Sequence, residues 1–271
     1  MLRLAGDGLT LAVHDEGQGQ PVLLLHGFPD SSYLWRDQVA ALVKAGMRVI
    51  VPDLRGFGES DKPEAVEEYA IARSVRDMLA VLDGLKVRRT HVVGHDFGAV
   101  VAWVLAASAP ERVDRLVAMS VGHPNALSER SIEQREKAWY TLLFQFAGVA
   151  EPLLKRDDWR LLRQLLRGHG DLERYIVDLA RPGALTAALN WYRANLAPHL
   201  ELENRAPLPA VAAPTLGIWS TEDSYLTEDR MLRSADHVTG QWNYERVEGA
   251  GHWMQRDAPE RINDLLLEFL S

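Results

Sequence analysis

The sequence predicts an α/β protein in which a mostly parallel central sheet carries helices on both faces and a helical cap is inserted between two strands. Two observations lead to this prediction. Short apolar runs that suit buried strands alternate with segments of helical period, as parallel sheets require because each crossover needs a helix. From residue 125 to residue 206 the alternation stops and one helical pattern follows another, and it resumes after Pro207, which indicates an insertion.

The first half of the chain alternates between strand and helix. Residues 9–14 alternate apolar and polar side chains, as an antiparallel edge strand does, and turn residues follow them. Residues 22–25 are apolar on both faces, which suits a strand buried inside a parallel sheet. The pattern then predicts in turn a helix at 35–45, a strand at 48–51, a helix at 69–84, a strand at 90–93, a helix at 97–108 and a strand at 116–119.

The second half contains the insertion and the return to alternation. Four helical patterns without a convincing strand fill the insertion, at residues 131–147, 157–167, 171–180 and 184–196. A strand at 215–219, a helix at 227–236, a strand at 242–247 and a helix at 259–270 then resume the earlier order. We therefore expect residues 1–124 and 207–271 to form the core domain and residues 125–206 to form the helical cap.

Composition restricts the classes of function. The chain of 271 residues is 47% hydrophobic and 25% charged, which suits one core with an inserted lobe. It has no cysteine, which excludes disulfides and thiol catalysis, and its formal charge of -8 gives no basic footprint for nucleic acid or anionic lipid. No segment has the pattern of a secretory signal or a membrane span. We expect a cytoplasmic protein with a small-molecule partner, no nucleic acid and no membrane contact.

One strand-to-helix corner organises the predicted site. The stretch from Gly94 to Gly98 follows the strand at 90–93 and leads into the helix at 97–108, with Asp96 at its tip. Glycines two before and two after Asp96 let the backbone fold sharply, so the turn can hold this carboxylate clear of the sheet as a nucleophile. The alternative is that Asp96 only caps the helix, a role for which Asp is well suited.

Two further polar side chains follow strands of the resumed sheet. Asp223 comes after the strand at 215–219, and His252 comes after the strand at 242–247. Ligands of open parallel sheets bind at the carboxyl ends of the strands, so both side chains are expected near Asp96. Each of them alone is more often a loop or cap residue, but together they give the chain order of nucleophile, acid and histidine that this kind of turn accompanies.

With these residues in view, the chain resembles the α/β-hydrolase family over nearly its whole length. The turn from His26 to Pro29 is similar to the family's oxyanion turn. The resemblance implies that Asp96 is the nucleophile of the branch that uses aspartate, with Asp223 and His252 as the other triad members. Glu222 is the weaker candidate for the acid.

Two segments of the insertion narrow the resemblance to soluble epoxide hydrolases. Residues 139–145 and 189–193 are similar to the two cap segments that each contribute one tyrosine there, and the matching positions are Tyr140 and Tyr192. A single Tyr in an apolar helix is usually a packing residue with its hydroxyl at the edge. Two tyrosines in matching segments imply instead a pair of acids above the nucleophile.

The resemblance implies that an epoxide is hydrolysed to a vicinal diol in two steps. The ionised Asp96 attacks an epoxide carbon and forms an alkyl ester while the two tyrosines protonate the oxygen. A water activated by His252, which Asp223 orients, then hydrolyses the ester, and the backbone N–H groups of Phe28 and Phe97 stabilise the oxyanion. Neither step needs a cofactor or a metal, and the sequence has no metal-ligand motif.

Aromatic residues near these positions predict a hydrophobic substrate. The side chains expected to contact it are Phe28, Pro29, Phe97, Trp139, Phe144, Trp191 and Trp253. The expected partners are a small hydrophobic epoxide and water, and the protein is expected to be a monomer or a homodimer. His26, His95 and His123 are expected to have structural roles.

Two alternatives remain open. A haloalkane or haloacid dehalogenase uses the same carboxylate, but such relatives carry Trp or Arg directly after the nucleophile, where this chain has Phe97. Trp139 and Trp191 keep this alternative open because an indole N–H can bind halide. The second alternative is a non-catalytic, ligand-binding member of the fold, although a pure binder has no need of a triad.

Overall fold

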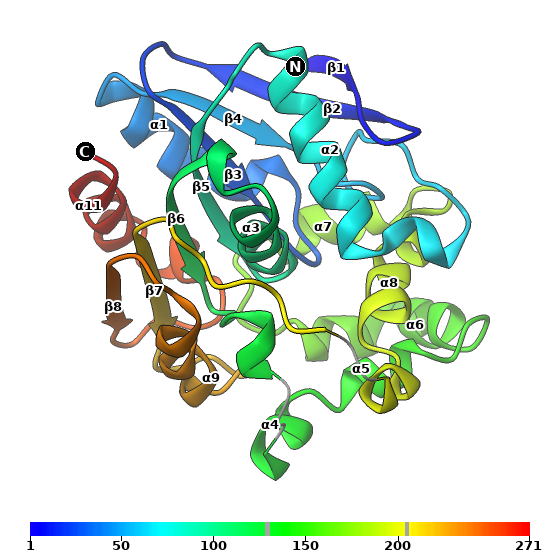
Figure 1. Cartoon of the computed structure of the whole chain (residues 1–271). Helices are drawn as coiled ribbons and strands as arrows, with labels where there is room; N and C mark the ends of the chain where they lie inside the picture. The colour runs from blue at the N-terminus through cyan, green and yellow to red at the C-terminus, as the bar shows by residue number, and fades with distance from the viewer. Residues whose placement is uncertain (128–130, 204–205) are drawn as a thin grey trace.

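The computed structural model describes residues 1–127, 131–203 and 206–271, and its centre is an eight-stranded sheet in the order β1-β2-β4-β3-β5-β6-β7-β8 (Figure 1). β2 pairs antiparallel with β1 and β4, and the other neighbouring strands pair in parallel. The strands are β1 (Leu2–Ala5), β2 (Thr10–Glu16), β3 (Pro21–Leu25), β4 (Arg48–Pro52), β5 (Thr90–His95), β6 (Val113–Met119), β7 (Thr215–Ser220) and β8 (Trp242–Val247).

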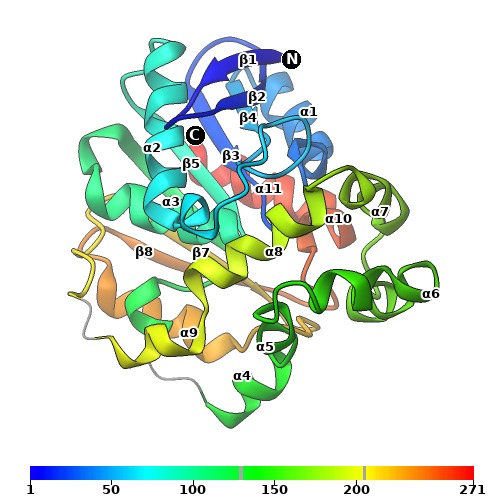
Figure 2. The same cartoon turned by 90° about the vertical axis from the view of Figure 1, so that its right-hand side faces the viewer.

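Helices cover both faces of the sheet. α1 packs against α11 on one face, and α2 packs against α3 on the other (Figure 1 and Figure 2). α3 is apolar nearly all round because it lies between the sheet and α2, whereas α2 and α11 are amphipathic. The helices of this part are α1 (Arg36–Lys44), α2 (Ile71–Gly84), α3 (Phe97–Ser108), α9 (Glu228–Leu232), α10 (Met254–Asp257) and α11 (Pro259–Leu270).

The remaining helices come between β6 and β7 in the chain. They are α4 (Ile132–Lys137), α5 (Tyr140–Phe144), α6 (Ala150–Leu165), α7 (Leu172–Ala180) and α8 (Ala184–Asn195), and we call residues 131–203 the helical segment. In Figure 2 these helices lie together below and to the right of the sheet. Within the described residues, no helix is both long and apolar enough for a bilayer crossing.

The predicted fold class, an α/β protein with a mostly parallel sheet, is confirmed. Every predicted strand is present, with ends that move by at most three residues. β1 was not predicted, because four residues at an exposed sheet edge give too short a hydrophobic pattern to recognise. β1 is held in the sheet by its antiparallel pairing with β2, which the sequence of β1 alone does not reveal.

Three predicted helices differ from the structure. The helix expected at 227–236 is α9 (Glu228–Leu232) followed by a 3-10 helix over Arg233–His237. The helix expected at 131–147 is divided into α4, which ends at Lys137, and α5, which begins at Tyr140 and ends at Phe144. The helix expected at 157–167 is only the second part of α6, which begins at Ala150 and has non-helical backbone from Arg156 to Trp159. Asp157 and Asp158 have φ of 52° and 54°, a conformation that Asp tolerates better than most residues, and hydrophobic period alone does not detect such a break.

Candidate active site

Asp96 stands at the corner between β5 and α3 in a strained backbone conformation, with φ 54° and ψ −125°. Such strain persists only where the surrounding chain enforces it. A Cβ atom on Gly94 would lie 2.3 Å from the carbonyl oxygen of Gly98, and a Cβ on Gly98 would lie 2.2 Å from that of Leu25. The glycine spacing seen in the sequence therefore has a steric cause: strand and helix approach too closely for any side chain at either position.

The Asp96 carboxylate is held by the turn that follows β3. Its Oδ1 accepts a hydrogen bond of 2.8 Å from the backbone N–H of Phe28, and a Cβ on Gly27 would lie 2.2 Å from the same oxygen. Burial by itself raises the pKa of Asp96, but the neighbouring imidazole of His252 and the Phe28 amide outweigh it and hold the pKa below its usual range. Asp96 is therefore ionised at neutral pH.

His252 lies between two carboxylates. Its Nδ1 is 2.8 Å from Oδ2 of Asp223, and its Nε2 is 3.7 Å from Oδ2 of Asp96. Burial by itself lowers the pKa of His252, but Asp223 and then Asp96 raise it to about 10. The backbone N–H groups of Tyr225 and Leu226 donate to the other oxygen of Asp223, so the acid is fixed at both oxygens.

Other histidines near the site hold backbone groups. Burial lowers the pKa of His95 to about 4, and its Nε2 donates to the carbonyl oxygen of His252 at 2.9 Å. His26 accepts a hydrogen bond of 3.0 Å from the backbone N–H of Leu54, which ties the loop after β4 to the turn after β3. These contacts support the structural roles expected for the two residues.

Tyr140 of α5 and Tyr192 of α8 line the same cavity as Asp96. Their ring centroids are 6.0 Å apart, with the ring planes at 76° to each other. Burial first, and then neighbouring acidic groups, raise the pKa of both phenols well above the ordinary value, so both keep their protons. The rings of Phe28 and Phe144 pack edge-on against Tyr192, with centroids 5.3 and 4.9 Å away, and fix its orientation.

The cavity is small, with a volume of about 10 Å³, close to the room that one water needs. Residues from the core and from the helical segment line it together: Phe28, Asp96, Tyr140, Leu165, Leu166, Tyr192, Tyr225, His252 and Trp253. An organic substrate of several atoms therefore enters only if one of these side chains or its element moves.

Only part of the predicted substrate-contact set lines this cavity. Phe28 and Trp253 do. Phe97, Phe144 and Pro29 are buried outside the lining, the first two against Tyr192.

Trp139 and Trp191, which were also predicted to contact the substrate, do not line the cavity at Asp96. Trp139 is 50% exposed, and Trp191 is fully buried with its indole N–H donating to the carbonyl oxygen of Arg55 at 3.0 Å. Each tryptophan directly precedes one of the two tyrosines, Tyr140 and Tyr192. Neighbouring residues on a helix point about 100° apart, so the side chain beside a cavity-lining tyrosine faces elsewhere.

Sequence reasoning missed Tyr225, Leu165 and Leu166. Tyr225 stands two residues after Asp223, and an aromatic side chain so close to a predicted acid at a strand end was a usable signal. The two leucines gave none, because a helical period shows that an apolar side chain is buried and not which surface it meets.

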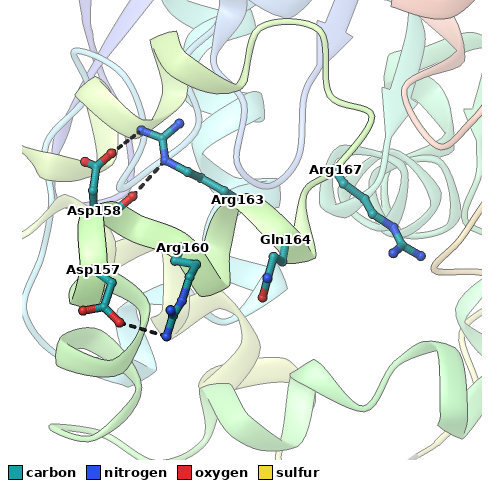
Figure 3. A pocket seen from close by; sticks show the side chains of 6 residues that line it. All are labelled: Asp157, Asp158, Arg160, Arg163, Gln164 and Arg167. Atoms are coloured by element: carbon teal, nitrogen blue, oxygen red, sulfur yellow. Dashed lines mark hydrogen bonds and ion pairs between the residues drawn. The ribbon is translucent and has the colours of Figure 1, made fainter.

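A larger hollow of about 640 Å³ lies on the second part of α6 (Figure 3). It is lined by Asp157, Asp158, Arg160, Arg163, Gln164 and Arg167. Asp157 pairs with Arg160 at 2.8 Å and Asp158 with Arg163 at 3.3 Å, so these charges compensate one another in an exposed setting. Among the described residues, no group of three or more His, Asp or Glu side chains is arranged to hold a metal ion. The cavity at Asp96 is the better candidate for chemistry.

The chain is similar to known proteins over nearly its whole length. A family model described as alpha/beta hydrolase fold matches residues 20–259. The chain is 34% identical to "Epoxide hydrolase A" of Mycobacterium tuberculosis, over 98% of this chain and 95% of that protein. It is 32% identical to human "Epoxide hydrolase 4", over 99% and 78%. A crystal structure of an epoxide hydrolase variant from Bacillus megaterium, complexed with its product, a naphthyloxy-propanediol, superposes with a TM-score of 0.89 at 27% identity and covers 99% of each chain.

Proposed function

The chain belongs to the alpha/beta hydrolase fold family, and we propose that it is an epoxide hydrolase that converts a hydrophobic epoxide into a vicinal diol. One observation carries the proposal: the ionised carboxylate of Asp96 shares a cavity with the protonated phenols of Tyr140 and Tyr192. An epoxide needs a nucleophile at carbon and an acid at oxygen, and this cavity supplies both. Names of similar proteins and a diol product in a similar structure support the same activity.

The first step is the opening of the ring. Asp96 attacks an epoxide carbon, so a carbon–oxygen bond forms on the carboxylate and the ring carbon–oxygen bond breaks. The hydroxyls of Tyr140 and Tyr192 hydrogen-bond the departing oxygen, and one of them gives it a proton. The product of this step is an alkyl ester of Asp96 and a tyrosinate.

The second step is the hydrolysis of that ester. Once ester formation has removed the charge of Asp96, the imidazolium of His252 releases its proton to solvent. The neutral imidazole then takes a proton from a water that attacks the carboxyl carbon of Asp96, and Asp223 stabilises the resulting imidazolium. The backbone N–H of Phe28 stays beside the developing oxyanion, and that of Phe97, which begins α3 and has no partner within the helix, is the second donor. The imidazolium protonates the diol as it leaves, and the proton of the regenerated carboxyl returns to the tyrosinate.

The helical segment has a defined part in this scheme. We take residues 1–124 and 207–271 as the core domain and residues 125–206 as a cap that carries both acids. Because the nucleophile lies on the core and both acids lie on the cap, the cap can close over Asp96 after the substrate has entered.

The dehalogenase alternative loses its main support. It depended on indole N–H groups of Trp139 and Trp191 that could hold halide. Trp191 donates to Arg55, and Trp139 is half exposed and does not line the cavity. Halide therefore has no indole donor from either residue beside Asp96.

The test uses a variant that stops between the two steps. His252→Gln protein treated with styrene oxide should accumulate an ester on the peptide that contains Asp96, detected by mass spectrometry as the added mass of the epoxide. The double variant Asp96→Ala with His252→Gln is the control and should stay unmodified. An unmodified Asp96 peptide in the single variant, at epoxide concentrations that the wild type turns over to diol, would falsify the covalent scheme.

A further inference from the structure

Tyr225 contacts three parts of the site at once. Its backbone N–H donates to Oδ1 of Asp223 at 2.8 Å. Its ring packs edge-on against the imidazole of His252, with centroids 5.0 Å apart. Its hydroxyl donates to the backbone carbonyl of Leu165, at the end of α6, at 2.6 Å. One residue therefore connects the predicted acid and the predicted base with the helical segment.

The loop that carries the acid is also tied to α4. We call residues 221–227 the acid loop. Buried Gln134 donates from Nε2 to the carbonyl oxygen of Tyr225 at 2.8 Å and accepts from the backbone N–H of Thr227 at 3.1 Å. Lys137 donates to the carbonyl oxygen of Asp223 at 2.7 Å. The position of Asp223 therefore depends on two helices of the helical segment as well as on β7.

The hydroxyl of Tyr225 differs in its role from those of the other two cavity tyrosines. Its proton is directed to the carbonyl of Leu165, and burial raises the pKa of the phenol well above its usual range, so the proton stays there. Tyr140 and Tyr192 instead line the cavity beside Asp96 and keep their protons. Tyr225 is thus placed to hold its neighbours and not to protonate an epoxide oxygen.

We propose that Tyr225 is a positioning residue that couples the seating of the helical segment to the geometry of the Asp223–His252 pair. While its hydroxyl is bound at Leu165, the ring keeps the imidazole aligned and the acid-loop amides keep Asp223 in place. When the helical segment moves away to admit substrate, the pair relaxes, and it is restored when the segment returns. The inference rests on the proposed function and assigns a role in its second step, the hydrolysis of the ester.

The charged and titratable groups around His252 determine how its pKa would change if the acid loop were loosened. Asp223 faces Nδ1, Asp96 faces Nε2, and neutral His95 packs against the ring with centroids 4.6 Å apart. Tyr140 and Tyr192 face it across the cavity with their protons on. Because the hydrogen bond to Asp223 is a main cause of the raised pKa of His252, a loosened acid loop should lower this pKa.

The test compares Tyr225→Leu, which removes ring and hydroxyl, with Tyr225→Phe, which keeps the ring and removes only the bond to Leu165. Tyr244→Phe is the matched control, because it removes a hydroxyl that donates to Glu228 at 2.6 Å outside the cavity lining. The pKa of His252 is read by NMR titration of the imidazole in the unreacted protein. Ester formation and ester hydrolysis are measured separately in single-turnover experiments.

In Tyr225→Leu, the pKa of His252 should fall by about half a unit or more and ester hydrolysis by about tenfold or more, while ester formation changes by less than about threefold. Tyr225→Phe should lie between this variant and the wild type, and Tyr244→Phe should match the wild type in all three measurements. An unchanged His252 pKa in both Tyr225 variants, or an equal loss in both chemical steps, would overturn the inference.

The two readouts separate this inference from the proposed function. The titration needs no substrate, so a lowered pKa supports the positioning role even if the wild type forms no ester from any epoxide, a result that would reject only the proposed function. Ester formation by the wild type with an unmoved pKa would reject only the inference. If Tyr225→Leu does not fold, as judged by thermal unfolding, Tyr225→Phe decides, and wild-type values of both its pKa and its hydrolysis rate would count against the inference.

Discussion

At the residue scale, the hydrogen bonds around Asp96 and Asp223 give these two carboxylates different chemical roles. Both oxygens of Asp223 are engaged, Oδ1 by two backbone N–H groups and Oδ2 by His252 at 2.8 Å. Asp96 binds the Phe28 amide through Oδ1, but its Oδ2 lies 3.7 Å from Nε2 of His252, longer than an ordinary hydrogen bond. Only Asp96 therefore presents an oxygen that can turn to an electrophilic carbon. Asp223, with both oxygens engaged, is placed to stabilise the imidazolium of His252.

The first prediction concerns the two phenols. Replacing Tyr140 and Tyr192 together by Phe should slow ester formation by about a hundredfold or more, because the departing oxygen loses both donors. Ester hydrolysis should change less, since its base is His252 and the tyrosinate only takes back a proton after the ester has been cleaved. Stopped-flow measurement of the two rate constants checks this, and a larger effect on hydrolysis than on ester formation would contradict the assigned roles.

The second prediction concerns the pH dependence of hydrolysis. In the unreacted protein Asp223 and Asp96 together raise the pKa of His252 to about 10. Ester formation removes the charge of Asp96 and leaves that of Asp223, so the pKa of His252 should fall and the imidazole should become available as a base. The rate of ester hydrolysis should rise with pH through a midpoint below the pKa that NMR gives for the unreacted protein. Coincident values would show that Asp96 has no influence on His252.

At the element scale, the close approach of β5, α3 and β3 fixes the corner that presents Asp96. We predict that Gly98→Ala lowers the free energy of unfolding by about 2 kcal/mol or more, because the new Cβ meets the backbone oxygen of Leu25 at 2.2 Å and backbone cannot yield as a side chain can. Urea unfolding measures this.

Gly84→Ala is the matched control for that change. Gly84 ends α2, and the nearest atom to its added Cβ would be a leucine methyl at 4.0 Å. This variant should be neutral or more stable by up to about 1 kcal/mol. Similar losses in both variants would mean that the corner is not sterically constrained.

At the scale of the whole molecule, a buried ion pair joins regions far apart in the chain. Arg55, in the loop after β4, pairs with Asp77 of α2 at 2.7 Å, and both side chains are fully buried. Asp77 also accepts from the backbone N–H of Asp7, in the turn between β1 and β2, and the carbonyl of Arg55 accepts from Trp191 of α8. The sheet edge, the loop, α2 and the helical segment thus meet at one ion pair.

We predict that Asp77→Asn lowers the free energy of unfolding by about 3 kcal/mol or more, because the buried charge of Arg55 loses its closest carboxylate and keeps only that of Glu68, 3.5 Å away. Asp83→Asn is the control on the same helix. It removes the pair with Arg112, but its carboxylate is 69% exposed, so less than about 1 kcal/mol should be lost. Urea unfolding of both variants provides the comparison, and equal losses would refute the role given to burial.

The amino-acid sequence is enough to predict the alternation of strand and helix, the run of helices between two strands, and Asp96, Asp223 and His252 as candidate site residues. These features depend on local period, on glycine spacing and on the chemistry of side chains at strand ends, all of which are local in the chain.

Tertiary structure alone decided which side chains meet across the cavity. Leu165 and Tyr225 line the cavity at Asp96 whereas Trp139 and Trp191 do not, and a helical pattern could not show this because it identifies a buried face without naming its partner. Tertiary structure also decided the raised pKa of His252, since that value depends on two carboxylates, at positions 96 and 223, that only folding brings to opposite sides of one ring.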